Sequence, residues 1–123
     1  MKKFVLKSSL SEIISVTPIE LYIFFHLFVI NYLNNVLAKI ESERLGAHDA
    51  LMLNSLGHLT ESTTSNFFFI RDGRIMTPSL DCGILAGITR DIVLRISQEN
   101  GYCIEEGAWP IEALEKADEM FLT

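Results

Sequence analysis

Residues 57–70 read GHLTESTTSNFFFI, a stretch in which a single acid, Glu61, precedes five small polar residues and three phenylalanines. Phenylalanine and isoleucine favour β-strands, so we expect a buried strand over residues 66–70. Serine, threonine and asparagine favour turns because their side chains bond to nearby backbone groups. The stretch therefore predicts a hydroxyl-rich turn, headed by one carboxylate, against a core strand.

The composition of the 123-residue chain is that of an acidic protein with a modest core. Hydrophobic residues make up 49% of it, which suits one domain that buries roughly two thirds of its unfolded surface. The net charge is -6 without a basic stripe, which argues against nucleic acid and anionic membranes as partners. Cys82 and Cys103 have no CxxC spacing, so we expect two buried thiols in a reducing compartment.

The first thirty residues differ from the rest of the chain. They carry three lysines and two acids, whereas the remainder carries seven bases and fourteen acids. The apolar run at 19–30 is too short to cross a bilayer, which takes about 20 residues. Lys7 and Glu12 interrupt any signal-peptide core, so we expect a cytoplasmic location. Residues 1–30 are thus predicted to be an atypical segment and residues 31–123 a mixed globular domain.

The apolar pattern after Asn31 predicts a mixed α+β fold. Apolar residues repeat at three and four over 33–45, which is typical of a helix, and Gly46 is placed to end it. A second helix is expected at 89–100. Short runs separated by the turn signals SLG and RDG predict an antiparallel meander. The other predicted elements are strands at 50–53, 58–60, 66–70, 74–77, 102–105 and 119–123, and a helix at 111–117 that Pro110 opens.

The sequence GILAGITRD at 83–91 carries a second candidate site. Gly87 and Ile88 directly precede the second predicted helix, and Thr89 is its expected N-cap, so free backbone N–H groups meet a hydroxyl there. Such a helix start binds anions, including phosphate. The alternative is a capped helix after a glycine turn, with no ligand.

Three motifs in fixed order, ESTTSNFF at 61–68, IMTP at 75–78 and LAGITR at 85–90, resemble the signature of the class IV aminotransferases, the fold-type IV pyridoxal-phosphate enzymes. The resemblance covers 31–123 and is greatest to branched-chain and D-amino-acid transaminases. It implies pyridoxal 5′-phosphate as cofactor. It also implies the cofactor domain of the D-amino-acid aminotransferase-like fold, here a partial pseudo-barrel of mostly antiparallel strands with flanking helices.

The resemblance assigns a role to each polar motif. Glu61 would face the pyridine nitrogen and keep it protonated, which makes the ring an electron sink. Ile88 and Thr89 would hold the phosphate, and Leu85 would pack on the ring. Tyr32 would offer its phenol to the ring oxygen O3′. The cluster of Thr63, Thr64, Ser65 and Asn66 would line the turn beside the ring.

Several of these residues also have ordinary structural explanations. Tyr32 is otherwise a core aromatic, and Ser65 and Asn66 are otherwise turn formers. Residues 67–69 are expected to be core strand residues that anchor the turn. The three histidines have no metal-site spacing, so no metal is predicted.

The lysine that forms a Schiff base with the cofactor in this family is missing. In the register set by Asn31, Phe28 or its neighbour Leu27 stands where that lysine belongs, and no lysine occurs between Lys7 and Lys39. Lys39 is about 16 Å further along a helix and does not replace it.

We therefore expect a truncated cofactor domain, inactive by itself. The resemblance implies that full-length relatives take amino acids and 2-oxo acids as substrates, and that they continue beyond both ends of this match. The open alternatives are a non-catalytic module that binds a phosphorylated ligand, a fragment derived from an aminodeoxychorismate lyase, and assembly as a homodimer or with a full-length relative. A further alternative is a chain that never folds stably, because the strands at 66–70 and 119–123 would have unpaired edges.

Overall fold

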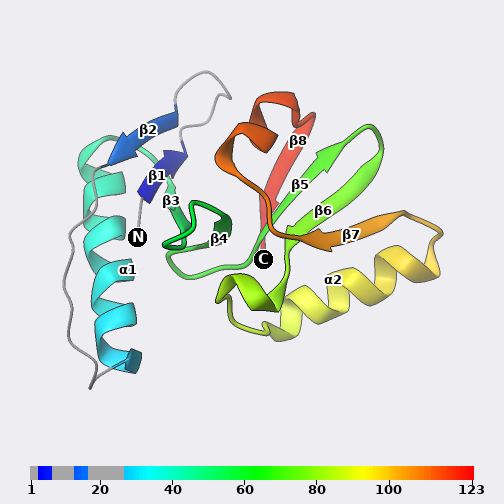
Figure 1. Ribbon diagram of the computed structural model, residues 1–123, viewed down its shortest axis with the longest axis horizontal. Helices are drawn as coiled ribbons and strands as arrows, with labels where there is room; N and C mark the ends of the chain where they lie inside the picture. Colours follow the sequence, from blue (N-terminus) through cyan, green and yellow to red (C-terminus); the bar gives the residue numbers. More distant parts are fainter. Residues whose placement is uncertain (1–2, 7–12, 17–26) are drawn as a thin grey trace.

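The computed structural model describes residues 3–6, 13–16 and 27–123, with side chains from Tyr32 onward (Figure 1). Its strands are β1 (Lys3–Leu6), β2 (Ile13–Val16), β3 (Asp49–Leu53), β4 (Leu59–Ser62), β5 (Phe67–Arg71), β6 (Arg74–Pro78), β7 (Ile104–Gly107) and β8 (Glu119–Leu122). Its helices are α1 (Leu27–Arg44) and α2 (Ile88–Glu99), with the short 3-10 helices η1 (Leu80–Cys82) and η2 (Ile111–Lys116).

The described strands form two four-stranded sheets, in the orders β2-β1-β3-β4 and β7-β6-β5-β8. All pairs are antiparallel except β6 with β7, which run parallel. Figure 1 shows α1 beside the first sheet and α2 along the second. The mixed α+β class is confirmed. The sheets form no closed barrel within the described residues, and only a partial one was predicted.

The predicted continuous meander is wrong, because β4 and β5 lie in different sheets. The turn at 63–66 carries the chain from one sheet to the other. Phe67, Phe68 and Phe69 are all at most 1% exposed, so both faces of β5 are covered. The expectation of an unpaired edge is wrong for 66–70, since β5 pairs with β6 and with β8, from Phe67↔Leu122 to Ile70↔Glu119. It holds for β8, whose outer edge has no partner among the described strands.

The first helix is confirmed, but much of the apolar stripe that predicted it is exposed. Gly46, with φ 71°, follows the helix in the left-handed conformation expected of its stop. Ala38 of α1 packs with Ala50 and Met52 of β3. Leu33 and Ile40, however, are 51% and 56% exposed, so the other described residues leave much of this stripe uncovered.

In the second half of the chain the predicted hairpin turn is confirmed, whereas the starts of two helices differ from the predictions. The hairpin turn between β5 and β6 has Asp72 at φ 52° and Gly73 at φ 72°, the two positive angles that a type I′ turn needs. The N-cap of α2 is Gly87 rather than Thr89, and it makes no side-chain capping bond. The helix expected at 111–117 is the 3-10 helix η2, with Pro110 as its N-cap and not inside it.

The larger core lies between the two sheets. It gathers buried residues from β3, β4, β5 and β6, and Leu114 of η2 closes it. Its members are Leu51, Leu53, Leu59, Phe67, Phe69, Met76 and Leu114. On the opposite face of β5, Phe68 stacks on Phe121 with ring centroids 4.9 Å apart. Of the two cysteines, Cys82 is buried as expected, whereas Cys103 is exposed because it lies just before β7.

None of the helices in the described part of the chain combines the length and apolar character that a membrane crossing needs.

Candidate functional site

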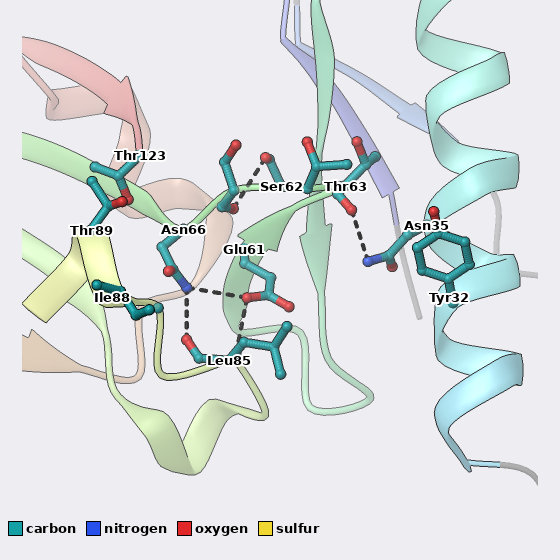
Figure 2. Close-up of a pocket in the computed structure, with 13 residues that line it drawn as sticks. Tyr32, Asn35, Glu61, Ser62, Thr63, Asn66, Leu85, Ile88, Thr89 and Thr123 are labelled. Atoms are coloured by element: carbon teal, nitrogen blue, oxygen red, sulfur yellow. Dashed lines mark hydrogen bonds between the residues drawn. The ribbon is translucent and has the colours of Figure 1, made fainter.

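A cleft of about 380 Å³ opens where the two sheets meet (Figure 2). Its walls come from α1, the end of β4 with the following turn, the loop that leads into α2, and Thr123 after β8. All seven residues predicted to bind a cofactor line it, namely Tyr32, Glu61, Ser65, Asn66, Leu85, Ile88 and Thr89. The structure thus brings together three parts of the sequence that the motifs had singled out separately.

Glu61 is half-buried and is the one acid among the described residues that line the cleft. Its Oε2 accepts hydrogen bonds from the backbone N–H of Leu85 at 3.0 Å and from Asn66 Nδ2 at 3.2 Å. Burial raises the pKa of the Glu61 carboxyl, and the Leu85 N–H partly opposes that rise by favouring the charged form. No lysine or arginine is among the described residues that line the cleft. The Glu61 carboxylate therefore has no cationic partner among these residues, and a cationic group of a ligand could take that place.

Asn66 holds the Glu61 side of the cleft to the loop before α2. The same Nδ2 that reaches Glu61 also donates to the carbonyl oxygen of Leu85 at 2.9 Å (Figure 2). Its backbone N–H and C=O exchange two hydrogen bonds with Thr123, at 3.2 and 3.1 Å. Asn66 is 6% exposed, so this is a fixed structural contact and more than a surface turn.

The N-terminus of α2 forms the opposite end of the cleft. The backbone N–H groups of Ile88 and Thr89 donate to no acceptor in the described residues, as expected for the first turn of a helix. The hydroxyl of Thr123 is buried and has no hydrogen-bond partner in that same part of the chain. Thr89 and Thr123 both line the cleft (Figure 2). Free N–H groups, two hydroxyls and a helix dipole together make a binding site for an anion.

Tyr32 and the apolar residues of the cleft face outward. Tyr32 is 68% exposed, so the alternative that it is a core aromatic is wrong. Leu85 and Ile88 are 66% and 81% exposed although both are apolar. Side chains of this kind at the edge of a cleft can cover the faces of a flat ligand.

Asn35 and Thr123 also line the cleft, although neither was predicted as a site residue. Asn35 Nδ2 donates to the carbonyl oxygen of Thr63 at 3.0 Å and so connects α1 to the turn after β4. Asn35 lies one helical turn beyond Tyr32, and this spacing could have predicted that both face the cleft. Thr123 had no local signal, because only the pairing of β5 with β8 brings it to Asn66.

The lysines of the described chain lie elsewhere. Lys39 is on α1, but its Nζ donates to the carbonyl oxygen of His48 at 2.5 Å, near the other end of the helix. Phe28, the position predicted to replace the family lysine, lies in the first turn of α1, and its side chain is outside the described residues.

The chain is similar in sequence and in structure to known aminotransferases. A family model described as class IV amino-transferase matches residues 27–123. The branched-chain-amino-acid aminotransferase of Escherichia coli K12 is 33% identical over 93 residues, which are 76% of this chain and 30% of that protein. Among solved structures, the branched-chain aminotransferase of Thermoproteus uzoniensis with norvaline is 40% identical, with a TM-score of 0.73, over 75% of this chain and 31% of that one.

A lyase has a similar fold. A Legionella pneumophila protein, whose proposed activity is that of a 4-amino-4-deoxychorismate lyase, is 36% identical, with a TM-score of 0.73, over 76% of this chain and 35% of that one. A further branched-chain aminotransferase, 40% identical with a TM-score of 0.71, was solved with pyridoxamine 5′-phosphate; the match covers 75% of this chain and 30% of that one.

The chain therefore belongs to the class IV aminotransferase family. It spans no more than about a third of the length of the curated relatives that it matches. Full-length relatives act on amino acids and 2-oxo acids, and the family and its solved complexes imply the use of pyridoxal phosphate.

Proposed function

We propose that this chain forms the cofactor-binding face of a pyridoxal-phosphate-dependent class IV aminotransferase, and that alone it binds the cofactor noncovalently without transamination. The observation that carries the proposal is the arrangement of one cleft: a half-buried carboxylate without a cationic partner at one end, and free N–H groups with hydroxyls at the other. Its volume of about 380 Å³ is in the range of small-molecule sites, about 300–1,000 Å³.

The residues at the Glu61 end fit a pyridine ring. Glu61 Oε2 is held by Leu85 and Asn66, and Oε1 has no hydrogen bond to the other described residues. A protonated ring nitrogen would give Oε1 a partner and would keep the carboxylate charged despite its burial. When bound, pyridoxal phosphate supplies an electron sink. Leu85 would cover one face of the ring, and Tyr32 would lie at the edge of the cleft toward α1.

The residues at the α2 end fit a phosphate. Ile88 and Thr89 offer backbone N–H groups, and Thr89 and Thr123 offer hydroxyls. Each hydrogen bond to a charged oxygen contributes about 1.5–3 kcal/mol, and the helix dipole about 0.3–1 kcal/mol more. Three such bonds are enough to hold the phosphate without a lysine or arginine.

Proton transfer at a substrate carbon is what this chain lacks. That step needs a base within hydrogen-bond reach of the substrate carbon, whereas Glu61 would be engaged by the ring nitrogen. The aliphatic residues Leu27 and Val29 and the aromatic Phe28 occupy the sequence positions around the missing lysine. We infer that a complete site would take a branched-chain amino acid and its 2-oxo acid, as the names of the relatives suggest; the lyase similarity is the alternative.

A binding experiment separates the two ends of the cleft. The 123-residue chain is titrated with pyridoxal 5′-phosphate and, separately, with inorganic phosphate. Glu61→Ala should weaken only the first ligand, by about 10- to 100-fold, whereas Thr89→Ala should weaken both. Glu99→Ala, at the exposed end of α2, is the control for the loss of a carboxylate. If neither Glu61→Ala nor Thr89→Ala changes binding, the site assignment is wrong.

A chemical experiment tests the absence of a reactive lysine. The loaded chain is reduced with borohydride and its peptides are mapped by mass spectrometry. We expect only scattered, substoichiometric lysine adducts in the wild-type chain, and one dominant adduct in Phe28→Lys or Leu27→Lys. A single stoichiometric adduct in the wild type, abolished by Glu61→Ala, would show a working lysine and overturn the proposal that the chain is inactive alone.

A further inference from the structure

A buried carboxylate lies behind the cleft, outside its lining. Asp49, the first residue of β3, is 7% exposed. Its Oδ1 accepts hydrogen bonds from Thr63 Oγ1 at 2.5 Å and from the backbone N–H of Ala50 at 2.8 Å. Its Oδ2 accepts one from Ser62 Oγ at 3.0 Å. Three donors from two parts of the chain therefore converge on one acid.

All three partners of Asp49 can donate to a carboxylate. Hydroxyls and an amide N–H all donate here, and an ionised carboxylate accepts without donating. Such charge-assisted bonds are about twice as strong as neutral ones. Ser62 Oγ has a single proton and two nearby acceptors, Asp49 Oδ2 and the Ser65 carbonyl at 3.1 Å. The charged acceptor is the stronger of the two, so the Ser62 hydroxyl is directed toward Asp49.

The turn that Asp49 holds is the wall of the cleft. Ser62 directly follows Glu61, and the backbone N–H of Ser62 donates to the Ser65 carbonyl at 2.8 Å. Thr63 contacts Asp49 through its hydroxyl and accepts the Asn35 amide through its carbonyl. The turn is thus fixed to β3 on one side and to α1 on the other. Among the described residues, no comparable hydrogen bond joins Asp49 to the start of α2.

We propose that Asp49 is a positioning residue of the cofactor cleft: by fixing Ser62 and Thr63, it sets the place of Glu61 and the spacing between the turn and α1. The inference rests on the proposed function and deepens it. In it, Asp49 orders the end of the cleft that would receive the ring nitrogen, and not the end that would receive the phosphate. Asp49 touches no ligand and acts only through the turn.

The test compares Asp49→Asn with the wild-type chain in two independent measurements. The first is the affinity for pyridoxal 5′-phosphate and for inorganic phosphate. We expect the first affinity to fall about tenfold, the loss of one charge-assisted hydrogen bond, and the second to stay unchanged. The matched control is Asp118→Asn, because Asp118 is an exposed acid that accepts the backbone N–H of Asp72 away from the cleft.

The second measurement is amide hydrogen exchange of the chain without ligand. Asp49→Asn should reduce the protection of the Ser62 N–H and leave that of the Ile75 N–H, which is bonded to the Cys103 carbonyl in the other sheet, unchanged. If Asp49→Asn does not fold, Thr63→Val removes one of the three donors and should cause the same effects at a smaller size.

The outcomes separate this inference from the proposed function. Equal weakening of both ligands, no weakening of either, or a uniform loss of protection along the chain would overturn a positioning role for Asp49. If the wild-type chain fails to bind pyridoxal phosphate, the proposed function fails, and the exchange measurement still decides whether Asp49 fixes the turn.

Discussion

A Cβ atom at position 87 would lie 3.3 Å from Asn66 Cγ and closer still to Asn66 Oδ1, so Gly87 and Asn66 share a space that admits no larger residue. The backbone of Gly87 does not itself require glycine, since its φ of −71° is open to any residue. What requires glycine is the close approach of the side chain that holds Glu61 and Leu85.

Gly87→Ala should therefore weaken ligand binding through Asn66. The added methyl group displaces the Asn66 amide, and we expect a loss of stability of about 1–3 kcal/mol together with weaker binding of pyridoxal phosphate. The measurements are urea unfolding and ligand titration. In an Asn66→Ala background the same substitution should cost much less, because the obstructing side chain is gone. Additive losses in the double variant would contradict this explanation.

Glu61→Gln should change how stability depends on pH. The pKa of Glu61 is higher in the folded chain than in the unfolded chain because of burial, so the folded state binds the proton more tightly. Wild-type stability should then fall as pH rises from the unfolded pKa, about 4.3, through the raised folded pKa.

The Glu61→Gln variant has no such proton to lose, and its amide oxygen can still accept from Leu85 and Asn66. We expect it to be more stable than the wild type at pH 7 and equally stable or less stable at pH 4. Thermal unfolding of both chains across this pH range gives the difference, in which the contributions of the other groups cancel. A difference that does not vary with pH would argue against the buried environment of Glu61.

Thr123→Val should have opposite effects on stability and on binding. The Thr123 hydroxyl is buried and finds no partner in the described chain, so the unliganded protein bears the cost of its desolvation. Valine has the same shape without this cost, and we expect a gain of up to about 1 kcal/mol in the free energy of unfolding. Phosphate affinity should fall by about 3- to 10-fold. Losses in both quantities would indicate that the hydroxyl has a structural partner.

Arg90→Ala should loosen the start of α2. Arg90 is 2% exposed, and its guanidinium donates to the Pro78 carbonyl at 3.0 Å and to Glu106 at 2.5 Å. Its removal leaves a cavity and an unpaired Glu106, and we expect a cost of about 2–4 kcal/mol, less than for a fully buried pair because Glu106 is partly exposed. Arg95→Ala, an exposed control on the same helix, should change stability by less than about 0.5 kcal/mol. Similar losses for both variants would contradict the assignment.

Local patterns in the sequence predicted most of the elements and the members of the cleft. The aromatic run of β5, the Asp-Gly turn and the amphipathic spacing of α2 are short-range signals, and the structure follows them. The site residues were predicted from the family resemblance of three motifs, and the structure brings those residues to one cleft.

Features that depend on distant segments were not predictable. The separation of β4 and β5 into two sheets depends on what covers each strand, and the placement of Thr123 depends on β8 reaching Asn66. Asp49 resembles any acid at the start of a strand, and only the fold shows that Ser62 and Thr63 bond to it. The apolar spacing in α1 predicted the helix correctly but could not show that Leu33 and Ile40 are exposed.

The position of β5 between β6 and β8 has a consequence for folding kinetics. Its pairing with β6 needs only a two-residue turn, and a hairpin of this kind forms in roughly 1–10 μs. Its pairing with β8 closes a far longer loop, in which Asp72 and Asp118 are 46 residues apart. We expect substitutions in the β5–β6 turn to slow folding and Phe121→Leu mainly to speed unfolding, as measured by chevron analysis. In that order of events both ends of the cleft wait for the last strand, because Thr123 borders the anion end and also exchanges hydrogen bonds with Asn66, which holds Glu61.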